Sequence, residues 1–460
     1  MKSILLLVVF AFLTVNAQSV LVVDQYGGGQ YITINAALTA AAAGDTIKVM
    51  PGLYQEQINL TKKVHFLAMD STVILDYQTS YTFYFNTGSN GSSLQGFNIR
   101  KPLTAASGVK DILIASNKFD STTVSLALGA GSSYFMNNLL RNSTLNASNS
   151  SEKIVIFGNR FENTTTTATL LTVSGGNIIV ANNEFFGGST AIAATSNCNI
   201  VANKIYNPNS TGISINHGVN LSITANFIKN AGQQGIYGIY NRSDLGTYYN
   251  VTLANNLVRG SSTNGGIYFA SYPSSGTYAK TLTAKLFNNI VYGTGRGIYI
   301  SGAWTANTLF EIKNNIFSSN TNEAITTSYG IMSTDYNCTF NNANNNLSGV
   351  GNLTGVNPQF VNPASEDFNL QSSSLCIDAG VPTPQDYDLD RTRNDMGIGG
   401  GSKSWSNMHS GLDNARILQL ALSPVATAQG NTITITGSGV ANKTQQTVPQ
   451  SNQSNSNSTR

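Results

Sequence analysis

Side chains that could do chemistry gather between Asn226 and Asn315 of this sequence. Arginine can pair with a carboxylate through two hydrogen bonds, and a suitably placed lysine or arginine can take a proton. The residues of this kind are Arg242, Asp244, Lys280 and Arg296. Aromatic rings with a polar tip suit contact with sugar rings, and seven lie here: Tyr237, Tyr240, Tyr248, Tyr249, Tyr272, Tyr278 and Trp304. The alternative is that the aromatic residues pack the loops and that Arg242 and Asp244 form a surface pair.

Three aspartates near the C-terminus raise the question of a metal. Asp386, Asp388 and Asp390 stand at alternate positions in "DYDLDRTRND", as in calcium-binding loops. An EF-hand is excluded because Arg391 stands where that loop needs glycine and Gly397 where it needs glutamate. These aspartates leave a structural Ca²⁺ in this segment as an alternative, and the sequence indicates no other cofactor. The histidines are isolated and have no zinc-type spacing: His65, His217 and His409.

The element that must position these residues is a repeat. An asparagine precedes an apolar step at intervals of 19 to 33 residues, and such a period indicates stacked repeats. The counted positions are Asn98, Asn117, Asn138, Asn159, Asn183, Asn203, Asn226, Asn256, Asn289, Asn315 and Asn346. Between them, short runs of alternating apolar residues predict strands and leave no room for a helix. We therefore predict an all-β, single-stranded, right-handed parallel β-helix of about 11–13 coils.

The asparagines have a structural explanation in such a stack. A tight corner between two strands needs a residue at positive φ, which asparagine tolerates. Stacked coils bring equivalent residues about 4.8 Å apart, so their side-chain amides can form a hydrogen-bonded ladder. The spacing lengthens after Asn226, which predicts inserted loops there, and loops on a rigid scaffold commonly carry function.

Composition shifts predict the boundaries. Residues 1–17 have the charged start, short apolar run and small-residue end of a signal peptide, so we expect a secreted or cell-surface protein. Residues 18–45 form an N-terminal cap with a helix over 33–43, and 46–400 form the β-helix with its C-terminal closure. Residues 412–440 form a small β segment, and the polar stretch 441–460 is a disordered tail.

Charge and cysteine content exclude several classes of protein. The net charge of +3 without a Lys/Arg cluster argues against nucleic acid as a partner, and no later run is long enough to span a membrane. The three cysteines cannot all pair. Buried free thiols are favoured, with a Cys338–Cys376 disulfide as the alternative and Cys198 left over.

Two further stretches resemble exported β-helix proteins of the pectate-lyase-like superfamily. "GGGQYITINAALTAAAAGDTIKVMPGLYQE" is similar to that family's opening, and "NPQFVNPASEDFNLQSSSLCIDAG" with "DYDLDRTRNDMGIGGG" is similar to its closure. The resemblance covers roughly residues 20–400 and implies the fold. The superfamily includes lyases, hydrolases, esterases, epimerases and non-catalytic members, so the resemblance implies no single activity.

The active-site patterns of the known branches are missing from the central coils. No paired-aspartate signature is present, "NHG" at 216–218 has no accompanying aspartate pair, and the acids between 112 and 335 are scattered. We therefore expect a monomer that binds extracellular polysaccharide or cell-surface glycan, with no catalysis demonstrable from sequence. The alternatives are a pectate-lyase-type polysaccharide lyase, or another carbohydrate-active enzyme, acting on an acidic glycan, and a structural adhesin stalk.

Overall fold

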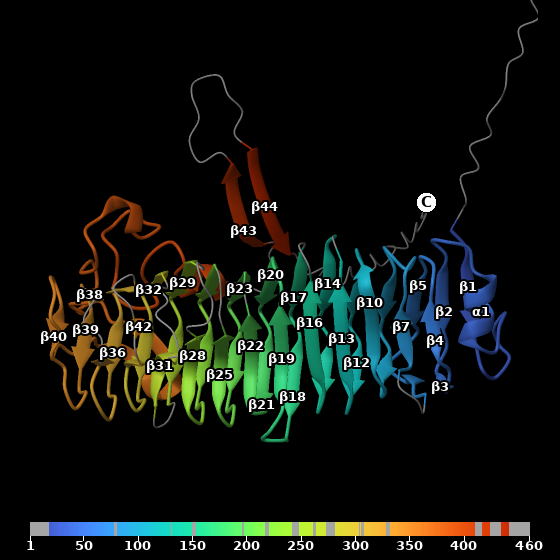
Figure 1. Cartoon of the computed structure of the whole chain (residues 1–460), viewed down its shortest axis with the longest axis horizontal. Coiled ribbons are helices and arrows are strands. Elements are labelled where there is room, and N and C mark those ends of the chain that lie inside the picture. The colour runs from blue at the N-terminus through green and yellow to red at the C-terminus, as the bar shows by residue number, and fades with distance from the viewer. Residues whose placement is uncertain are drawn as a thin grey trace, which may run out of the picture.

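The computed structural model describes residues 18–409 except 78–80, 130, 150–152, 196, 217–219, 242–247, 261–263, 273–280, 303, 305–307 and 328–331, and also the strands at 416–423 and 434–440. Three long parallel sheets run the length of a stack of coils (Figure 1). Each coil gives one strand to sheet A, the next to sheet B and the third to sheet C. Sheets A and B have 14 strands and sheet C has 12, which makes about 12 coils. The predicted parallel β-helix is confirmed.

From β2 to β39 the strands follow one another in strict rotation through the three sheets. Sheet A contains β1 (Val20–Val23), β2 (Thr46–Val49), β5 (His65–Ala68), β8 (Ser93–Gln95), β11 (Leu113–Ala115), β14 (Ser133–Met136), β17 (Ile154–Phe157), β20 (Ile178–Ala181), β23 (Cys198–Val201), β26 (Leu221–Thr224), β29 (Tyr248–Ala254), β32 (Thr281–Phe287), β35 (Thr308–Lys313) and β38 (Met332–Asp335). Sheet B contains β3 (Gly52–Tyr54), β6 (Val73–Leu75), β9 (Asn98–Ile99), β12 (Lys118–Asp120), β15 (Leu139–Arg141), β18 (Arg160–Asn163), β21 (Glu184–Gly187), β24 (Lys204–Tyr206), β27 (Phe227–Lys229), β30 (Leu257–Arg259), β33 (Ile290–Tyr292), β36 (Ile316–Ser318), β39 (Cys338–Phe340) and β40 (Leu353–Thr354). Sheet C contains β4 (Ile58–Leu60), β7 (Phe83–Phe85), β10 (Leu103–Val109), β13 (Thr123–Leu128), β16 (Thr144–Asn149), β19 (Thr169–Ser174), β22 (Thr190–Thr195), β25 (Thr211–Asn216), β28 (Gln234–Asn241), β31 (Gly265–Tyr272), β34 (Ile298–Gly302) and β37 (Ile325–Thr327).

The remaining elements lie at the two ends of the chain. Helix α1 (Ile34–Ala40) buries Ile34, Ala37 and Leu38 at the N-terminal end of the stack, and it is shorter than the predicted helix over 33–43 because the backbone becomes extended at Ala41. After the last coil come the antiparallel pair β41 (Phe360–Asn362) and β42 (Asp367–Leu370), the 3₁₀ turns η1 (Pro363–Ser365) and η2 (Pro384–Asp386), and helix α2 (Trp405–His409). Within the range predicted as a small β segment, β43 (Arg416–Ser423) and β44 (Thr434–Val440) pair antiparallel.

A continuous asparagine ladder fills the corner between sheets A and B. In each step one Oδ1 accepts hydrogen bonds from the backbone N–H and the Nδ2 of the asparagine one coil earlier; both are 2.9 Å between Asn159 and Asn183. The Nδ2 also donates to a backbone carbonyl, as Asn159 does to Phe135 at 2.9 Å. The ladder consists of Asn117, Asn138, Asn159, Asn183, Asn203, Asn226, Asn256, Asn289, Asn315, Asn337 and Asn352.

Two of the counted asparagines are not ladder members. Phe97 occupies the ladder position in the coil of Asn98, and its backbone N–H donates to Asn117 Oδ1 at 3.0 Å. Asn346 lies beyond the last corners, where its N–H donates to the side chain of Asn344. The ladder position in that part of the chain belongs instead to Asn337, which the apolar-step pattern missed.

The positive backbone angle belongs to the residue before the ladder asparagine, so the prediction that one residue serves both purposes was wrong. Asn182 has φ 53° and Asn288 has φ 57°, and Ala202 and Ala225 both adopt φ 55°. A corner therefore needs two residues with separate tasks. The first turns the chain, and the second supplies the ladder amide.

A second apolar core lies outside the solenoid, between sheet B and residues 356–409, which we call the closure. The residue after each ladder asparagine points outward, and it changes from charged in β18 and β21 to apolar in later coils. Phe227, Leu257, Ile290, Ile316 and Cys338 are buried there against Phe360, Phe368, Cys376, Met396 and Ile398 of the closure. The predicted coil-closing segment therefore folds back along the flank of the stack. All three cysteines are buried and free.

Candidate functional site

Three tyrosines form a row on the outer face of sheet C where the coils lengthen. Strand pairing aligns Tyr237 with Tyr268, and Tyr268 with Tyr299. Their rings stack, with centroids 5.0 Å and 4.7 Å apart and planes tilted by 20° and 12°. One coil earlier the same column holds the small residue Ser214. The tyrosine row therefore begins at β28 and belongs to the expanded coils.

The stacking decides which part of each ring can meet a ligand. Because neighbouring strands lie about 4.8 Å apart, stacked rings cover each other's faces and leave edges and hydroxyl groups along the row. The hydroxyl of Tyr268 hydrogen-bonds with the Ser301 hydroxyl at 2.8 Å. The row therefore offers ring edges and the Tyr268 hydroxyl, which its hydrogen bond with Ser301 holds in place.

A charged pair stands beside the far end of the row. The Arg296 guanidinium lies 4.8 Å from the Tyr299 ring centroid, and its Nε is 4.0 Å from Glu323 Oε2. The Thr326 hydroxyl donates to Glu323 at 2.8 Å, and this bond, followed by weaker effects that include Arg296, lowers the pKa of the Glu323 carboxyl. Arg296 thus contacts both a carboxylate and an aromatic ring, an arrangement that suits binding better than proton abstraction.

The other predicted aromatic residues divide into three groups. Tyr249 is 2% exposed and belongs to the main core, so its assignment to carbohydrate binding was wrong. Trp304 is partly buried, donates its indole N–H to the Ser301 carbonyl at 3.0 Å and packs edge-on against Phe310. Strands β28, β29 and β31 contain Tyr240, Tyr248 and Tyr272, whose side chains are outside the described part. Also outside the described residues are Arg242, Asp244, Tyr278 and Lys280.

Sequence reasoning missed Tyr268 and Tyr299, although a signal was present. The tripeptide Gly-Ile-Tyr occurs at 235–237, 238–240, 266–268 and 297–299, and the first, third and fourth copies are spaced by 31 residues. A repeat interval equal to the coil length places equivalent residues in register. This spacing was a sequence signal for Tyr268 and Tyr299.

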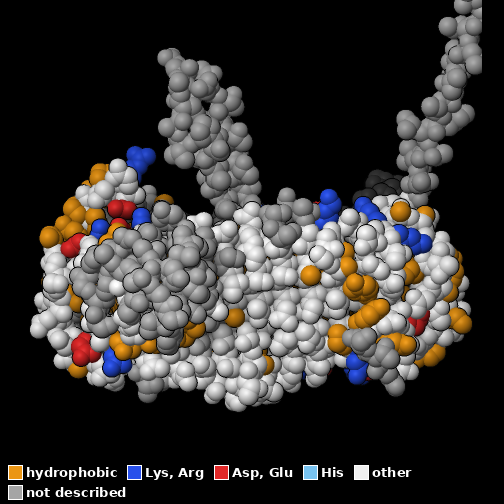
Figure 2. All heavy atoms as spheres, in the orientation of Figure 1, with side chains coloured by type: hydrophobic (Ala, Val, Ile, Leu, Met, Phe, Trp, Pro, Cys, Tyr) orange, Lys and Arg blue, Asp and Glu red, His pale blue; other side chains and the backbone are white. Residues whose placement is uncertain are grey.

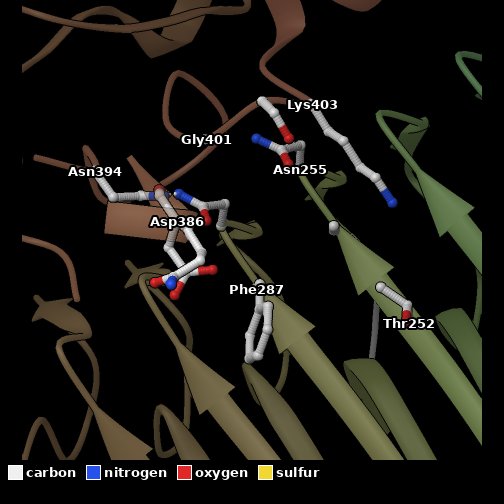
Figure 3. A pocket seen from close by; sticks show the side chains of 11 residues that line it. Thr252, Asn255, Phe287, Asp386, Asn394, Gly401 and Lys403 are labelled. Carbon is white, nitrogen blue, oxygen red and sulfur yellow. Dashed lines mark hydrogen bonds between the residues drawn. The ribbon is translucent and has the colours of Figure 1, made fainter. Parts of the chain in front are cut away.

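A small pocket lies between the outer face of sheet A and the closure (Figure 3). It has a volume of about 180 Å³, with Thr252 and Phe287 on the strand side and Asp386, Asn394 and Lys403 on the closure side. Burial lowers the pKa of the Lys403 ammonium. Ligand pockets usually measure roughly 300–1,000 Å³, so this cavity could take only a small group.

The amides in this pocket already hold the closure. Asn255 Nδ2 donates to the carbonyls of Ile398 and Gly400 at 3.2 Å and 2.7 Å. Asn288 Nδ2 donates to Asn394 Oδ1 at 2.7 Å and to the carbonyl of Asp395 at 2.7 Å. These are the first asparagines of Asn-Asn corners, and their side chains attach the closure to the coils. The pocket therefore marks the place where the closure is attached to the coils.

The aspartates considered as calcium ligands support backbone turns. Asp388 accepts the N–H groups of Asp395 and Gly401, and Asp390 accepts the N–H and hydroxyl of Thr392. Asp386 lines the pocket. Among the described residues, no group of three or more His, Cys, Asp or Glu side chains could hold a metal ion.

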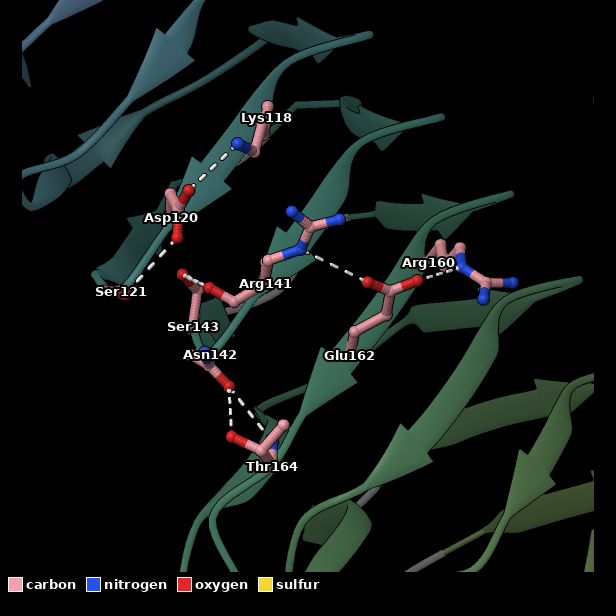
Figure 4. A network of polar contacts seen from close by, with 9 residues as sticks. All are labelled: Lys118, Asp120, Ser121, Arg141, Asn142, Ser143, Arg160, Glu162 and Thr164. Atoms are coloured by element: carbon pink, nitrogen blue, oxygen red, sulfur yellow. Dashed lines mark hydrogen bonds and ion pairs between the residues drawn. The ribbon is translucent and has the colours of Figure 1, made fainter.

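A ladder of opposite charges covers sheet B in the earlier coils (Figure 4). Lys118 pairs with Asp120 at 2.9 Å, and Arg160 bridges Glu162 at 2.6 Å and Glu184 at 2.9 Å. Hydrogen bonding from Arg160 is the largest effect that lowers the pKa of Glu162. Because each charge is paired with an opposite charge on its own or a neighbouring coil, this surface has little net electrostatic attraction for a polyanion. We therefore interpret the ion pairs as contacts that hold the coils together.

Comparison with known proteins finds solved structures of low similarity and indicates no specific activity. No protein-family model and no curated protein matches the sequence. Solved structures similar to it include the catalytic unit of a GH87 α-1,3-glucanase from Streptomyces thermodiastaticus, with 13% identity, TM-score 0.44, and 68% of this chain and 60% of that one covered. A PL6 polysaccharide lyase from Pseudopedobacter saltans is 16% identical with a TM-score of 0.42, and the match covers 75% of this chain and 96% of that one. The adhesin PfbA of Streptococcus pneumoniae is 13% identical with a TM-score of 0.42, and the match covers 69% of this chain and 85% of that one.

These identities and TM-scores are too low to say what this chain binds. This chain spans 60% of the length of the glucanase catalytic unit. No helix in the described part of the chain is both long and apolar enough to cross a bilayer. The chain is thus a parallel β-helix protein whose structural neighbours include polysaccharide lyases, a glycoside hydrolase and an adhesin.

Proposed function

We propose that this chain is an exported protein that binds extracellular polysaccharide along the tyrosine row of sheet C. The observation that carries the proposal is the alignment of Tyr237, Tyr268 and Tyr299 at one-coil intervals. Sugars present hydroxyl groups along their length, and a row of tyrosine rings held by stacking meets them without first losing side-chain rotamer freedom.

The position of the row separates it from an aromatic stack on the outer face of sheet B. On sheet B, Phe186 and Tyr206 also stack at 5.0 Å, with Arg160 4.1 Å above Phe186. That stack leads through Phe227 to Trp405 of the closure and is part of the packing. The tyrosine row lies on another sheet and ends at Arg296, so it is the better binding surface.

Hydrogen bonding is the interaction to expect on this face. Figure 2 shows few charged side chains across the middle of the visible surface, with most of them toward the two ends. Arg296 is the cation placed to meet an acidic sugar, and it already contacts Glu323. Binding then depends on several weak contacts repeated along an extended chain, which a rigid coil stack supplies at fixed spacing.

Affinity electrophoresis through gels containing neutral or acidic polysaccharides tests the proposal. We expect retardation by at least one glycan, and Tyr268→Ala should raise the apparent Kd at least about tenfold, as for a central contact residue. Tyr206→Ala, in the matched stack on sheet B, should leave retardation unchanged. Equal effects of the two variants, or no retardation by any glycan, would count against the row.

The same glycans separate the two alternatives. A lyase would generate from an acidic glycan an unsaturated product, which is detected by its short-wavelength ultraviolet absorbance in solution, and a stalk would bind no glycan at all. Either result would replace the proposal of a non-catalytic binder.

A further inference from the structure

Two of the three cysteines lie together where the closure meets the C-terminal end of the stack. Cys338 is the first residue of β39, directly after the ladder asparagine Asn337, and Cys376 belongs to the closure. Both are 0% exposed, both belong to the outer apolar core, and their thiol groups contact each other. Cys198 lies apart from them, in β23 and in the main core. The chain therefore holds one pair of thiols and one isolated thiol.

The backbone on the coil side of this pair is fixed without help from the second cysteine. The N–H of Cys338 donates to the Asn315 carbonyl at 2.8 Å. Strand β39 is also paired on both sides, with β36 and with β40. The Cys338 thiol donates to the Val356 carbonyl at 3.2 Å, and this hydrogen bond sets the direction of the side chain.

The backbone on the closure side is fixed as well. The N–H of Cys376 donates to Ser374 Oγ at 3.2 Å, and that hydroxyl donates to the Pro358 carbonyl at 2.7 Å. The Cys376 carbonyl accepts the N–H of Met396 at 2.9 Å. Two cysteines can be bridged without backbone movement only where the fold already holds them close together. Because each of these backbones has its own hydrogen bonds, the fold holds the two sulfurs in place before any bond joins them.

We propose that Cys338 and Cys376 form a disulfide that fastens the closure to the coils when the chain folds in the presence of a small-molecule disulfide such as oxidised glutathione. The three free thiols described above are those of the reduced chain. Disulfides form and persist in oxidising surroundings, which an exported protein meets. The occurrence of the bond outside the cell therefore rests on the proposed export, whereas the chemistry of the pair does not.

The bond has to form before the closure is fully packed, because the two thiols of the folded chain are out of reach of a reagent in solution. In the first step a cysteine thiolate attacks oxidised glutathione, forms a mixed disulfide and releases one glutathione thiolate. As the closure packs on the coils, the thiolate of the other cysteine attacks the protein sulfur of the mixed disulfide and releases the second glutathione thiolate. The two protein thiols are thereby oxidised, and one glutathione disulfide is reduced to two thiols, which take up the two protons.

Refolding the full chain from urea, either with glutathione disulfide or with a phosphine reductant, tests the proposal. When the refolded samples are unfolded again, maleimide should label one cysteine in the first and all three in the second. Trypsin and a glutamate-specific protease should release the peptides 324–366 and 367–391 of the first sample as a joined pair, with the label on Cys198 in the peptide 185–204. Three labelled cysteines in both samples, a link to Cys198, a link only between two molecules, or glutathione retained on Cys338 or Cys376 would overturn the proposal.

The effect on unfolding tests whether the bond fastens the closure. A crosslink between residues 338 and 376 restricts the unfolded chain, so the urea midpoint of the oxidised chain should exceed that of the reduced chain by at least about 0.5 M. Cys376→Ser is the matched control, because it keeps a small side chain but cannot form the bond, and its midpoint should be the same after both refolding conditions. Equal midpoints for the oxidised and reduced forms of the unsubstituted chain would refute the fastening.

Discussion

Removing one ladder amide is the sharpest test of how the coils are held together. Asn226 is fully buried, and its Oδ1 accepts hydrogen bonds from the backbone N–H and the Nδ2 of Asn203, both at 3.0 Å. Its Nδ2 donates to the Ile200 carbonyl at 2.9 Å and to Asn256 Oδ1 at 3.0 Å. Each contact joins one coil to a neighbouring coil, so a substitution acts across the stack.

The size of the effect follows from what is left unpaired. In Asn226→Ala the backbone N–H of Asn203 loses its acceptor, and the Ile200 carbonyl, in a strand paired on both sides, loses its side-chain donor. A buried unpaired polar group costs about 1–3 kcal/mol, so the unpaired N–H lowers the free energy of unfolding by about that amount before any cavity cost. Asn226→Asp keeps the shape and one acceptor oxygen, but its second oxygen would face the Ile200 carbonyl and Asn256 Oδ1, so it should destabilise the chain at least as much.

Urea unfolding followed by circular dichroism measures the change, and an exposed ladder contact gives the control. Asn59 accepts one hydrogen bond from Asn86 at 3.2 Å on the surface of sheet C, so Asn59→Ala should cost no more than about 0.5 kcal/mol. Equal losses for Asn226→Ala and Asn59→Ala would refute the view that the buried amides link the coils.

Three further predictions concern the closure and the cysteines. Asn288→Gly keeps the positive φ but removes the side-chain hydrogen bonds to the closure, so backbone amide hydrogen exchange should become faster at residues 394–398. The control is Asn137→Gly, at a corner that the closure does not contact, and it should leave that exchange unchanged. Burial raises the pKa of the Asp395 carboxyl from 3.8 to about 6, so its contribution to stability is complete below pH 4 and lost as the pH rises through 6. Asp395→Asn should flatten that part of the curve of melting temperature against pH, and an unchanged slope would contradict the assignment. All three cysteines are buried and free, so none should react with maleimide at pH 8 until urea unfolds the chain, when three should; a labelled native protein would contradict this burial.

The sequence predicted the coils better than it predicted the site. Period-2 apolar runs and regularly spaced asparagines are local properties, because each coil repeats the same contacts with the next. That is why the parallel β-helix and most of the ladder could be read directly. Asn98 was miscounted because one residue of offset moves a side chain off the corner column, which only the strand register reveals.

The candidate site shows the same division. Tyr237 was chosen for its place in a long interval, and the repeated Gly-Ile-Tyr triplet could have added Tyr268 and Tyr299. Tyr249 was chosen on the same grounds, but an inward position in β29 placed it in the core. Whether an aromatic side chain packs or faces solvent depends on its strand parity, and the long insertions obscured that parity in the sequence.

The sequence by itself determined the stack, the corner asparagines and the stretch of expanded coils, because these depend on neighbours one coil apart. Only the tertiary structure decided where the closure lies. Its attachment to Asn255 and Asn288 joins residues more than 100 positions apart and has no period. The sequence shows that the outward residue after the ladder asparagine changes from charged Glu184 to apolar Leu257. It does not show the cause, which is that the closure covers the later coils. An outward apolar residue acquires a reason only when the segment that covers it is placed in space.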